Sequence, residues 1–180
     1  MARPRRIADT SIFALIRTLL AEQGPRGVSF AAVALRCGLA APSLVERYGS
    51  RDQMVRAALT DGWDRLDQTT TLAIAATGNG SKGAAALLKS LAPSDPALPP
   101  PDLPVLLGQM PDPALRQRAA LWRQRVIEVL AEKLNYPGQD RAEMLFAAWQ
   151  GRLFWEPVTA GSFRLRDAAR LISAPLNPTR

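Results

Sequence analysis

The sequence predicts an all-α protein of about nine helices in a chain of 180 residues. Two observations support this prediction. Apolar side chains recur every three to four residues along most of the chain, which is the period of a helix, and the alternation typical of β-strands is nearly absent. Glycine and proline also stand between these periodic segments, where they end one helix and open the next.

Two helices are expected first. Residues 12–20 carry one apolar stripe, which the glycine and proline at 24–25 end. Ser29 can then cap a second helix by accepting a hydrogen bond from its first turn. Gly38 is well placed to end that helix, because a left-handed backbone is tolerated best by glycine.

A third and a fourth helix follow closely. Pro42 fits the first turn of the third helix, where a missing amide hydrogen costs nothing. Leu44 and Tyr48 lie one helical turn apart and are expected to face inward together. Residues 50–53 (Ser-Arg-Asp-Gln) form a capping box, so the fourth helix should begin there and run into the 70s.

The rest of the chain is expected to be helical with two breaks. Residues 77–83 (TGNGSKG) are interpreted as a flexible break, and the proline-rich residues 93–104 as an irregular surface loop. The remaining helices are expected at about 84–91, 113–134, 140–155 and 163–173.

The helix at 140–155 is apolar nearly all round, so both of its sides should be covered. One side can meet the chain's own core. We expect the other side, together with the last helix, to meet a second copy of the chain in a homodimer. The residues expected at this interface are Ala147, Ala148, Gly151, Phe154, Leu165, Ala169 and Ile172.

Positive charge is concentrated near the N-terminus. Residues 1–60 hold nine arginines and four acidic residues, a net charge of +5, whereas residues 61–180 hold 14 basic and 12 acidic residues, a net charge of +2. Basic charge gathered at one end favours a polyanionic partner, and double-stranded DNA is the first candidate. A solubilising basic surface is the alternative.

Three short helices, with a tight turn between the second and the third, are typical of a helix-turn-helix unit, whose last helix enters the major groove of DNA. We expect residues 1–50 to form this unit and residues 51–180 to form a helical effector-binding and dimerisation domain. Exposed positions of the third helix would contact bases, and the arginines around it would contact phosphates. The candidate DNA-binding residues are Arg5, Arg6, Ser29, Ala41, Pro42, Ser43, Glu46, Arg47, Tyr48 and Arg51, with Arg56 as a further phosphate contact.

These segments resemble the tetracycline-repressor (TetR) family of bacterial regulators over about residues 12–60. Residues 12–24 and 28–38 match the family's first two helices, and residues 38–44 and 47–52 match its turn, recognition helix and fourth-helix start. The resemblance implies a ligand-responsive, DNA-binding transcriptional regulator. It further implies a homodimeric repressor that acts on a near-palindromic operator.

Five residues depart from the family pattern. Arg47 and Arg51 replace a frequent histidine and lysine with equal or better phosphate donors. Ala40 stands where a capping serine or threonine is usual, and Val45 replaces a common phosphate-binding tyrosine. Glu46 places a negative charge toward DNA, where it can accept from a cytosine amine but is repelled by phosphates. Val45 and Glu46 are the basis for an alternative function, a TetR-like scaffold with lost or weak operator binding that serves as a small-molecule or protein partner module.

The resemblance also implies a pocket for a small-molecule effector between helices. Large apolar side chains could line it, although plain core packing explains the same residues equally well. The candidates are Trp63, Leu66, Met110, Trp122, Phe146 and Trp149. The absence of histidine argues against a metal-chelated ligand, so a lipophilic effector is expected.

Composition excludes several classes of function. With no histidine, a single cysteine and no phosphate-binding loop, the chain offers neither a catalytic pair nor a metal site, so we expect no enzyme activity, metal or cofactor. Cys37 cannot form an internal disulfide and suits a reducing cytosol. No apolar run is long enough to span a bilayer, and the N-terminus has no apolar signal segment, so a cytoplasmic protein is expected.

Overall fold

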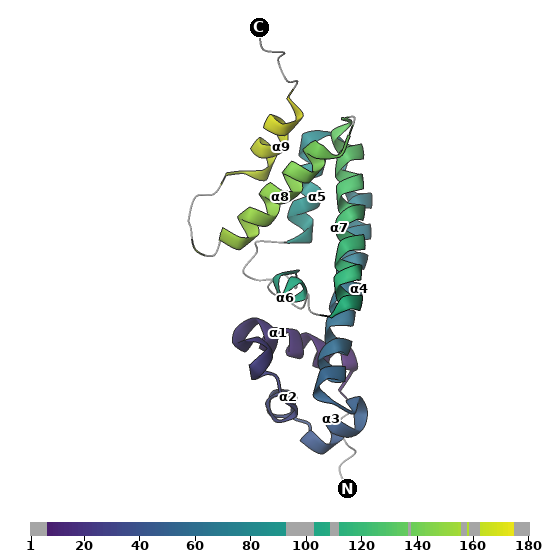
Figure 1. Ribbon diagram of the computed structural model, residues 1–180, viewed down its shortest axis with the longest axis vertical. Coiled ribbons are helices and arrows are strands. Elements are labelled where there is room, and N and C mark those ends of the chain that lie inside the picture. The colour runs from purple at the N-terminus through teal and green to yellow at the C-terminus, as the bar shows by residue number, and fades with distance from the viewer. Residues whose placement is uncertain are drawn as a thin grey trace. The chain divides into compact units, whose positions relative to one another are not determined.

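The computed structural model describes residues 7–92, 103–108, 112–136, 138–155, 158 and 163–174. Within these ranges the regular elements are nine α-helices, which confirms the predicted fold class (Figure 1). They are α1 (Asp9–Gly27), α2 (Phe30–Cys37), α3 (Ala41–Tyr48), α4 (Arg51–Ala76), α5 (Gly80–Leu91), α6 (Leu103–Leu107), α7 (Pro113–Leu134), α8 (Asp140–Trp155) and α9 (Leu165–Ser173).

The chain divides into two compact units. Unit 1 consists of Met1–Leu66 and Asp102–Arg118, and unit 2 consists of Asp67–Pro101 and Ala119–Arg180. The division falls within α4 and within α7, so each of these helices contributes to both units. The boundary expected after residue 50 separates a DNA-binding part from an effector-binding and dimerisation part. This functional division stays a prediction.

Unit 1 contains the helix-turn-helix expected from the sequence. Within it, α1 packs against α2 and α6, and α2 packs against α3. Its buried apolar residues come from α1 to α4 and α6, and include Ile12, Ile16, Leu19, Val33, Leu44, Met54, Leu59 and Leu106.

The helix ends of unit 1 follow the local signals of the sequence. The Ser29 hydroxyl accepts a hydrogen bond from the Ala32 amide at 3.1 Å. Gly38 has φ 72° and ψ 21°, the left-handed conformation expected of it. Ser50 and Gln53 exchange side-chain-to-backbone hydrogen bonds at 3.1 and 3.2 Å, which confirms the capping box.

A buried arginine joins α1 to α4 inside unit 1. Arg17 is only 3% exposed, and its guanidinium donates to the Asp61 carboxylate at 2.7 Å and to the Ala58 carbonyl at 2.9 Å. Gly62 makes room for this contact, because a Cβ there would lie 2.9 Å from Arg17 Cδ and 2.9 Å from Leu106 Cδ2. The pair therefore fastens the first helix of the helix-turn-helix to the N-terminal half of α4.

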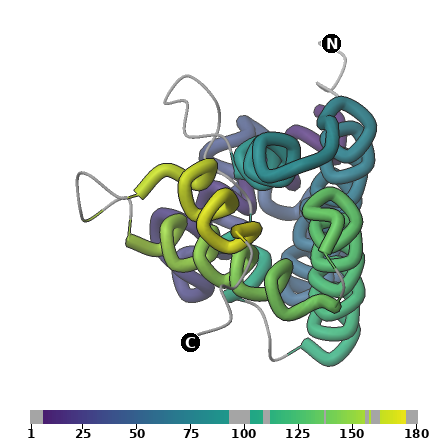
Figure 2. The backbone as a smooth tube through the Cα atoms, turned by 90° about the horizontal axis from the view of Figure 1, so that it is seen from above, coloured from purple at the N-terminus to yellow at the C-terminus, as the bar shows by residue number. Residues whose placement is uncertain are grey.

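In unit 2, α9 packs against both α5 and α8 (Figures 1 and 2). An aromatic cluster lies in the interior of the unit. The ring centroids of Trp122 and Phe146 are 6.0 Å apart, and those of Phe146 and Trp149 are 5.4 Å apart. The Trp122 indole donates to the buried Thr70 hydroxyl at 2.9 Å, which joins α7 to the C-terminal half of α4.

A lysine distant in sequence caps the C-terminal end of α4. Lys133 of α7 is 6% exposed, and its ammonium group donates to the carbonyls of Thr77 at 2.6 Å and Gly78 at 3.3 Å. The last carbonyls of a helix have no partner within it and carry partial negative charge, so a buried cation there satisfies them.

Four boundaries differ from the sequence-based expectations. Helix α1 continues to Gly27, past the residues 24–25 predicted to end it, although Gly24 itself is non-helical with φ 67° and ψ −175°. Helix α5 begins at Gly80 rather than near 84, so the predicted break at 77–83 is shorter than expected. Gly83 belongs to that helix, and a Cβ there would lie 1.7 Å from the Gly78 carbonyl oxygen, so this glycine permits a close backbone approach. Helix α6 covers the last part of the expected loop at 93–104, of which 93–102 lie outside the described residues, and α9 begins at Leu165 rather than 163.

Candidate nucleic-acid interface and effector site

Helix α3 presents one face to solvent and one to the core of unit 1. Leu44 is fully buried and anchors the helix. Pro42, Ser43 and Glu46 are exposed, as expected of positions that would face bases, whereas Ala41 is half-buried. Because Pro42 has no hydrogen-bonding side chain, Ser43 and Glu46 carry the polar groups of this face that can read a base edge.

The C-terminal end of α3 is fastened to the start of α1. Arg47 pairs with the Asp9 carboxylate at 2.9 Å and donates to the Ile7 carbonyl at 3.1 Å. The Tyr48 hydroxyl donates to the same carboxylate, and its ring packs 5.9 Å from that of Phe13. The hydrogen bond from Tyr48 lowers the pKa of Asp9, while burial and the bond to Asp9 raise the pKa of Tyr48. Arg47 and Tyr48, which were both expected to contact DNA, thus have partners within unit 1.

Arg51, another expected phosphate contact, braces the start of α4. Its guanidinium donates to the Val28 carbonyl at 2.7 Å and to the Pro25 carbonyl, and pairs with Asp52 at 2.9 Å. Pro25 lies in the last turn of α1, and Val28 lies in the connection between α1 and α2. Ser29, the remaining candidate in this region, is exposed and serves as the cap of α2.

Most of the N-terminal arginines are paired, which the charge count alone could not reveal. Ion pairs join Arg17 to Asp61, Arg36 to Glu22, Arg47 to Asp9, Arg51 to Asp52 and Arg56 to Asp112. Arg26 is exposed and makes no ion pair with the described residues. Arg5 and Arg6, the expected basic arm, lie outside the described residues. The net charge of +5 therefore overstates the positive charge that α1 to α4 hold free for phosphates.

The candidate effector-binding residues fall into separate places. Trp63 and Leu66 are buried on α4 in unit 1. Trp122, Phe146 and Trp149 form the aromatic cluster of unit 2, as described above. The sixth candidate, Met110, lies outside the described residues.

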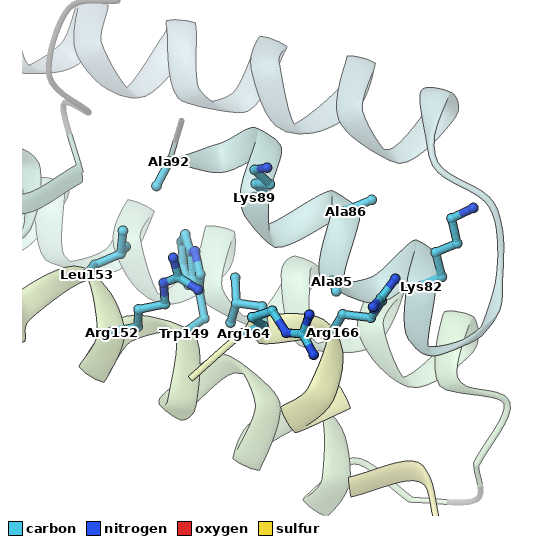
Figure 3. A pocket seen from close by; sticks show the side chains of 11 residues that line it. Lys82, Ala85, Ala86, Lys89, Ala92, Trp149, Arg152, Leu153, Arg164 and Arg166 are labelled. Carbon is cyan, nitrogen blue, oxygen red and sulfur yellow. The ribbon is translucent and has the colours of Figure 1, made fainter. Parts of the chain in front are cut away.

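A cavity of about 480 Å³ opens in unit 2 between α5, α8 and the start of α9 (Figure 3). Of the predicted effector-binding residues, Trp149 lines it. Five basic side chains that the sequence analysis did not single out also line it, two lysines from α5 and three arginines from α8 and the start of α9. They are Lys82, Lys89, Arg152, Arg164 and Arg166. The two lysines lie seven residues apart, which places both on one face of a helix. This spacing is the feature of the sequence that could have indicated a basic site here.

An apolar stripe runs along the exposed side of α8. Ala147 and Gly151 are exposed, Ala148 is half-buried, and Phe154 is 74% exposed. A Cβ on Gly151 would meet nothing within 4 Å, so this position faces open space. Spacings of three and four residues place all four on one side of the helix. Met144 and Trp155 extend the same side.

The interface residues expected on α9 differ in their exposure to solvent. Leu165 and Ala169 are buried in the interior of unit 2, whereas Ile172 is half-buried and Leu171 is exposed. Ile172 and Leu171 line a second cavity of about 580 Å³, together with Met144 of the apolar stripe. The exposed apolar side chain of α9, Leu171, thus lies in its C-terminal half.

No group of three or more histidine, cysteine, aspartate or glutamate side chains gathers into a metal-binding arrangement in the described part of the chain. The same residues contain no helix with the length and apolar character that a bilayer crossing requires.

Residues 12–58 match the family model described as bacterial regulatory proteins, tetR family. This segment is therefore similar to that family. The TetR resemblance noted in the sequence is thereby confirmed, and the matched residues span α1 to α3 and the start of α4. No curated protein matches the chain by sequence.

Solved structures of transcriptional regulators share the fold. One from Rhodococcus sp. RHA1 superposes with a TM-score of 0.69 at 20% identity, covering 92% of this chain and 94% of that one. The multidrug-binding protein EbrR, solved with malachite green, gives a TM-score of 0.67 at 18% identity over 95% of this chain and 100% of its own. The ketosteroid transcriptional regulator KstR2 of Mycobacterium tuberculosis gives 0.63 at 14% identity over 96% of both chains. The TetR-type helix-turn-helix is therefore followed here by the helical arrangement of such regulators.

Proposed function

We propose that the protein is a ligand-responsive, DNA-binding transcriptional regulator, which acts in the cytoplasm as a homodimeric repressor on a near-palindromic operator. One observation carries this proposal: α3 presents an exposed face at Pro42, Ser43 and Glu46 inside a segment that matches the tetR family. A two-fold dimer would present two such helices, which is why the operator should be near-palindromic.

The DNA-binding step is tested by genomic footprinting of the purified protein, which detects binding and locates the operator together. Glu46→Gln sharpens the test, because Glu46 is exposed on the base-reading side of α3. Removing its charge should change sequence preference, and should raise non-specific affinity by removing repulsion from phosphates. Glu128→Gln on the exposed side of α7 makes the same charge change elsewhere and should alter neither property.

A protein that fails to retard its own upstream DNA at low salt, and shows no salt-dependent binding to any duplex, would contradict this function. A second function, a TetR-like partner module with weak operator binding, would then be favoured. Specific observations support it. Val45 is 45% exposed where the family commonly has a tyrosine, and Arg47 and Arg51 are engaged within unit 1.

The homodimer is supported by the apolar stripe on α8. Leaving Phe154 74% exposed and Trp155 56% exposed in water is costly, and a second copy with the same stripe would cover both. Gly151→Arg places a long cation in the middle of the stripe without disturbing the interior of unit 2. This change should convert the dimer to a monomer in sedimentation experiments.

Ala120→Arg is the matched control for the dimer, since it adds the same side chain to an exposed position of α7. This variant should leave the dimer intact. Sedimentation of the unmodified chain as a monomer at micromolar concentration, or a dimer that tolerates Gly151→Arg, would refute the model.

The effector step is supported by the cavity beside Trp149 and by the fold shared with EbrR, which was solved with malachite green. A ligand bound in unit 2 changes DNA affinity only if it binds one arrangement of the two α3 helices more tightly than another. The direct measurement is the affinity for operator DNA with and without ligand.

A further inference from the structure

The cavity between α5, α8 and α9 combines an apolar floor with a basic rim (Figure 3). Trp149 is 1% exposed and forms the floor with Ala85, Leu153 and Leu165. The rim consists of the five cations Lys82, Lys89, Arg152, Arg164 and Arg166, and none of the described residues that line the cavity is acidic.

Three of the five cations of this rim, Lys82, Lys89 and Arg166, have no acidic partner among the described residues. Arg164 pairs with Asp167 at 2.6 Å, which lowers the pKa of that carboxyl group. Arg152 donates to the Phe163 carbonyl at 2.9 Å. The charges of Lys82, Lys89 and Arg166 are therefore the ones that an anion in the cavity can compensate.

Like charges that face a common cavity repel one another, and an anion placed between them removes that repulsion. A neutral apolar ligand would fill the floor but would leave the cations without a counter-charge. The volume of about 480 Å³ falls in the ordinary range for small-ligand pockets. Charge, floor and size together specify the chemistry of the occupant.

We propose that this cavity binds a small organic anion with an apolar body, of the medium-chain carboxylate type. The apolar body lies against Trp149 and the aliphatic floor, and the carboxylate lies among the side chains of Lys82, Lys89 and Arg166. This ligand class would be that of the effector. Only its role as an effector rests on the proposed regulatory function, because the binding itself is measured without DNA.

The test compares three probes with one chain length and different head groups: dodecanoate, dodecanol and dodecylammonium. Each is titrated into the full chain by calorimetry. Dodecanoate should bind about tenfold more tightly than dodecanol, and dodecylammonium should bind most weakly. The preference for dodecanoate should shrink as salt is added, because salt screens interactions between exposed charges.

Variants locate the binding. Lys89 and Arg166 are exposed, so Lys89→Gln and Arg166→Gln should fold normally, and each should weaken dodecanoate binding by about threefold while leaving dodecanol binding unchanged. Arg116→Gln removes the same charge from an exposed position of α7 outside the cavity and should have no effect. Thermal unfolding of each variant checks that the fold is intact.

Equal affinities for dodecanoate and dodecanol, or dodecanoate binding that ignores Lys89→Gln and Arg166→Gln, would overturn the inference. Duplex DNA that competes with dodecanoate for these cations would also overturn it and reassign them to a nucleic-acid surface. Dodecanoate binding in a chain that binds no DNA would support the cavity and refute the regulatory function. DNA binding without dodecanoate binding would refute the proposed ligand of the cavity and leave the regulatory function supported.

Discussion

Replacing Arg17 by methionine should lower the free energy of unfolding by about 3 kcal/mol, because a buried ion pair that loses one partner leaves the other charge uncompensated. Methionine keeps much of the aliphatic volume, so the change removes mainly the bonds to Asp61 at 2.7 Å and to Ala58 at 2.9 Å. Asp61 retains some exposure to water at 18%, which places the cost at the lower end of the range for buried pairs. For a chain of this size, the loss corresponds to a melting temperature about 6–12 °C lower.

Urea unfolding followed by circular dichroism measures this loss. Arg36→Met is the matched control, because its pair with Glu22 is exposed and should contribute less than about 1 kcal/mol. Asp61→Asn combined with Arg17→Met removes both charges, so the double variant should lose less than the sum of the two single variants. Additive losses, or an Arg17→Met loss no larger than that of Arg36→Met, would refute the role assigned to this pair.

Three further predictions concern other contacts. The raised pKa of Tyr48 means that its neutral form is favoured in the fold, so its contribution to stability is complete below pH 10 and is lost as the pH rises past that value. Tyr48→Phe should flatten the alkaline part of the stability–pH curve, and an unchanged curve would contradict the contact with Asp9. Lys133→Met should destabilise the chain by about 2 kcal/mol in urea unfolding, because it leaves the part-buried Thr77 and Gly78 carbonyls after α4 without their cationic partner. Gly83→Ala should lower helicity measured by circular dichroism, since its Cβ would overlap the Gly78 carbonyl, whereas Gly151→Ala should leave it unchanged.

Those features of the candidate site that depend on contacts between residues close in sequence could be predicted from the sequence. Ser29, Gly38 and the Ser50–Gln53 box set helix ends through bonds that span three or four residues, so their roles could be inferred from residue type and spacing. The exposed positions of α3 followed in the same way, because Leu44 had to face inward. The resemblance to the tetR family rests on these same local features.

The engagement of the arginines could not be inferred from the sequence. Arg47 reaches the Ile7 carbonyl 40 residues earlier, and Arg51 reaches the Val28 carbonyl in the connection between α1 and α2, 23 residues earlier. A charge count treats these side chains as free, whereas the fold assigns most of them to partners. The cavity was missed for a related reason, since its cations come from α5, α8 and the start of α9, and only the spacing of the two α5 lysines could be seen in the sequence.

The sequence by itself determined the helical class, the ends of the short N-terminal helices and the face of α3 that meets solvent. Each of these depends on interactions within one or two helical turns, which residue order specifies directly. Only the tertiary structure decided that Lys133 caps α4 from 56 residues away, that Arg17 is buried against Asp61, and that basic residues of α5, α8 and α9 share one cavity. Such contacts depend on which helices pack together, and packing is set by the complementarity of whole surfaces rather than by any local pattern.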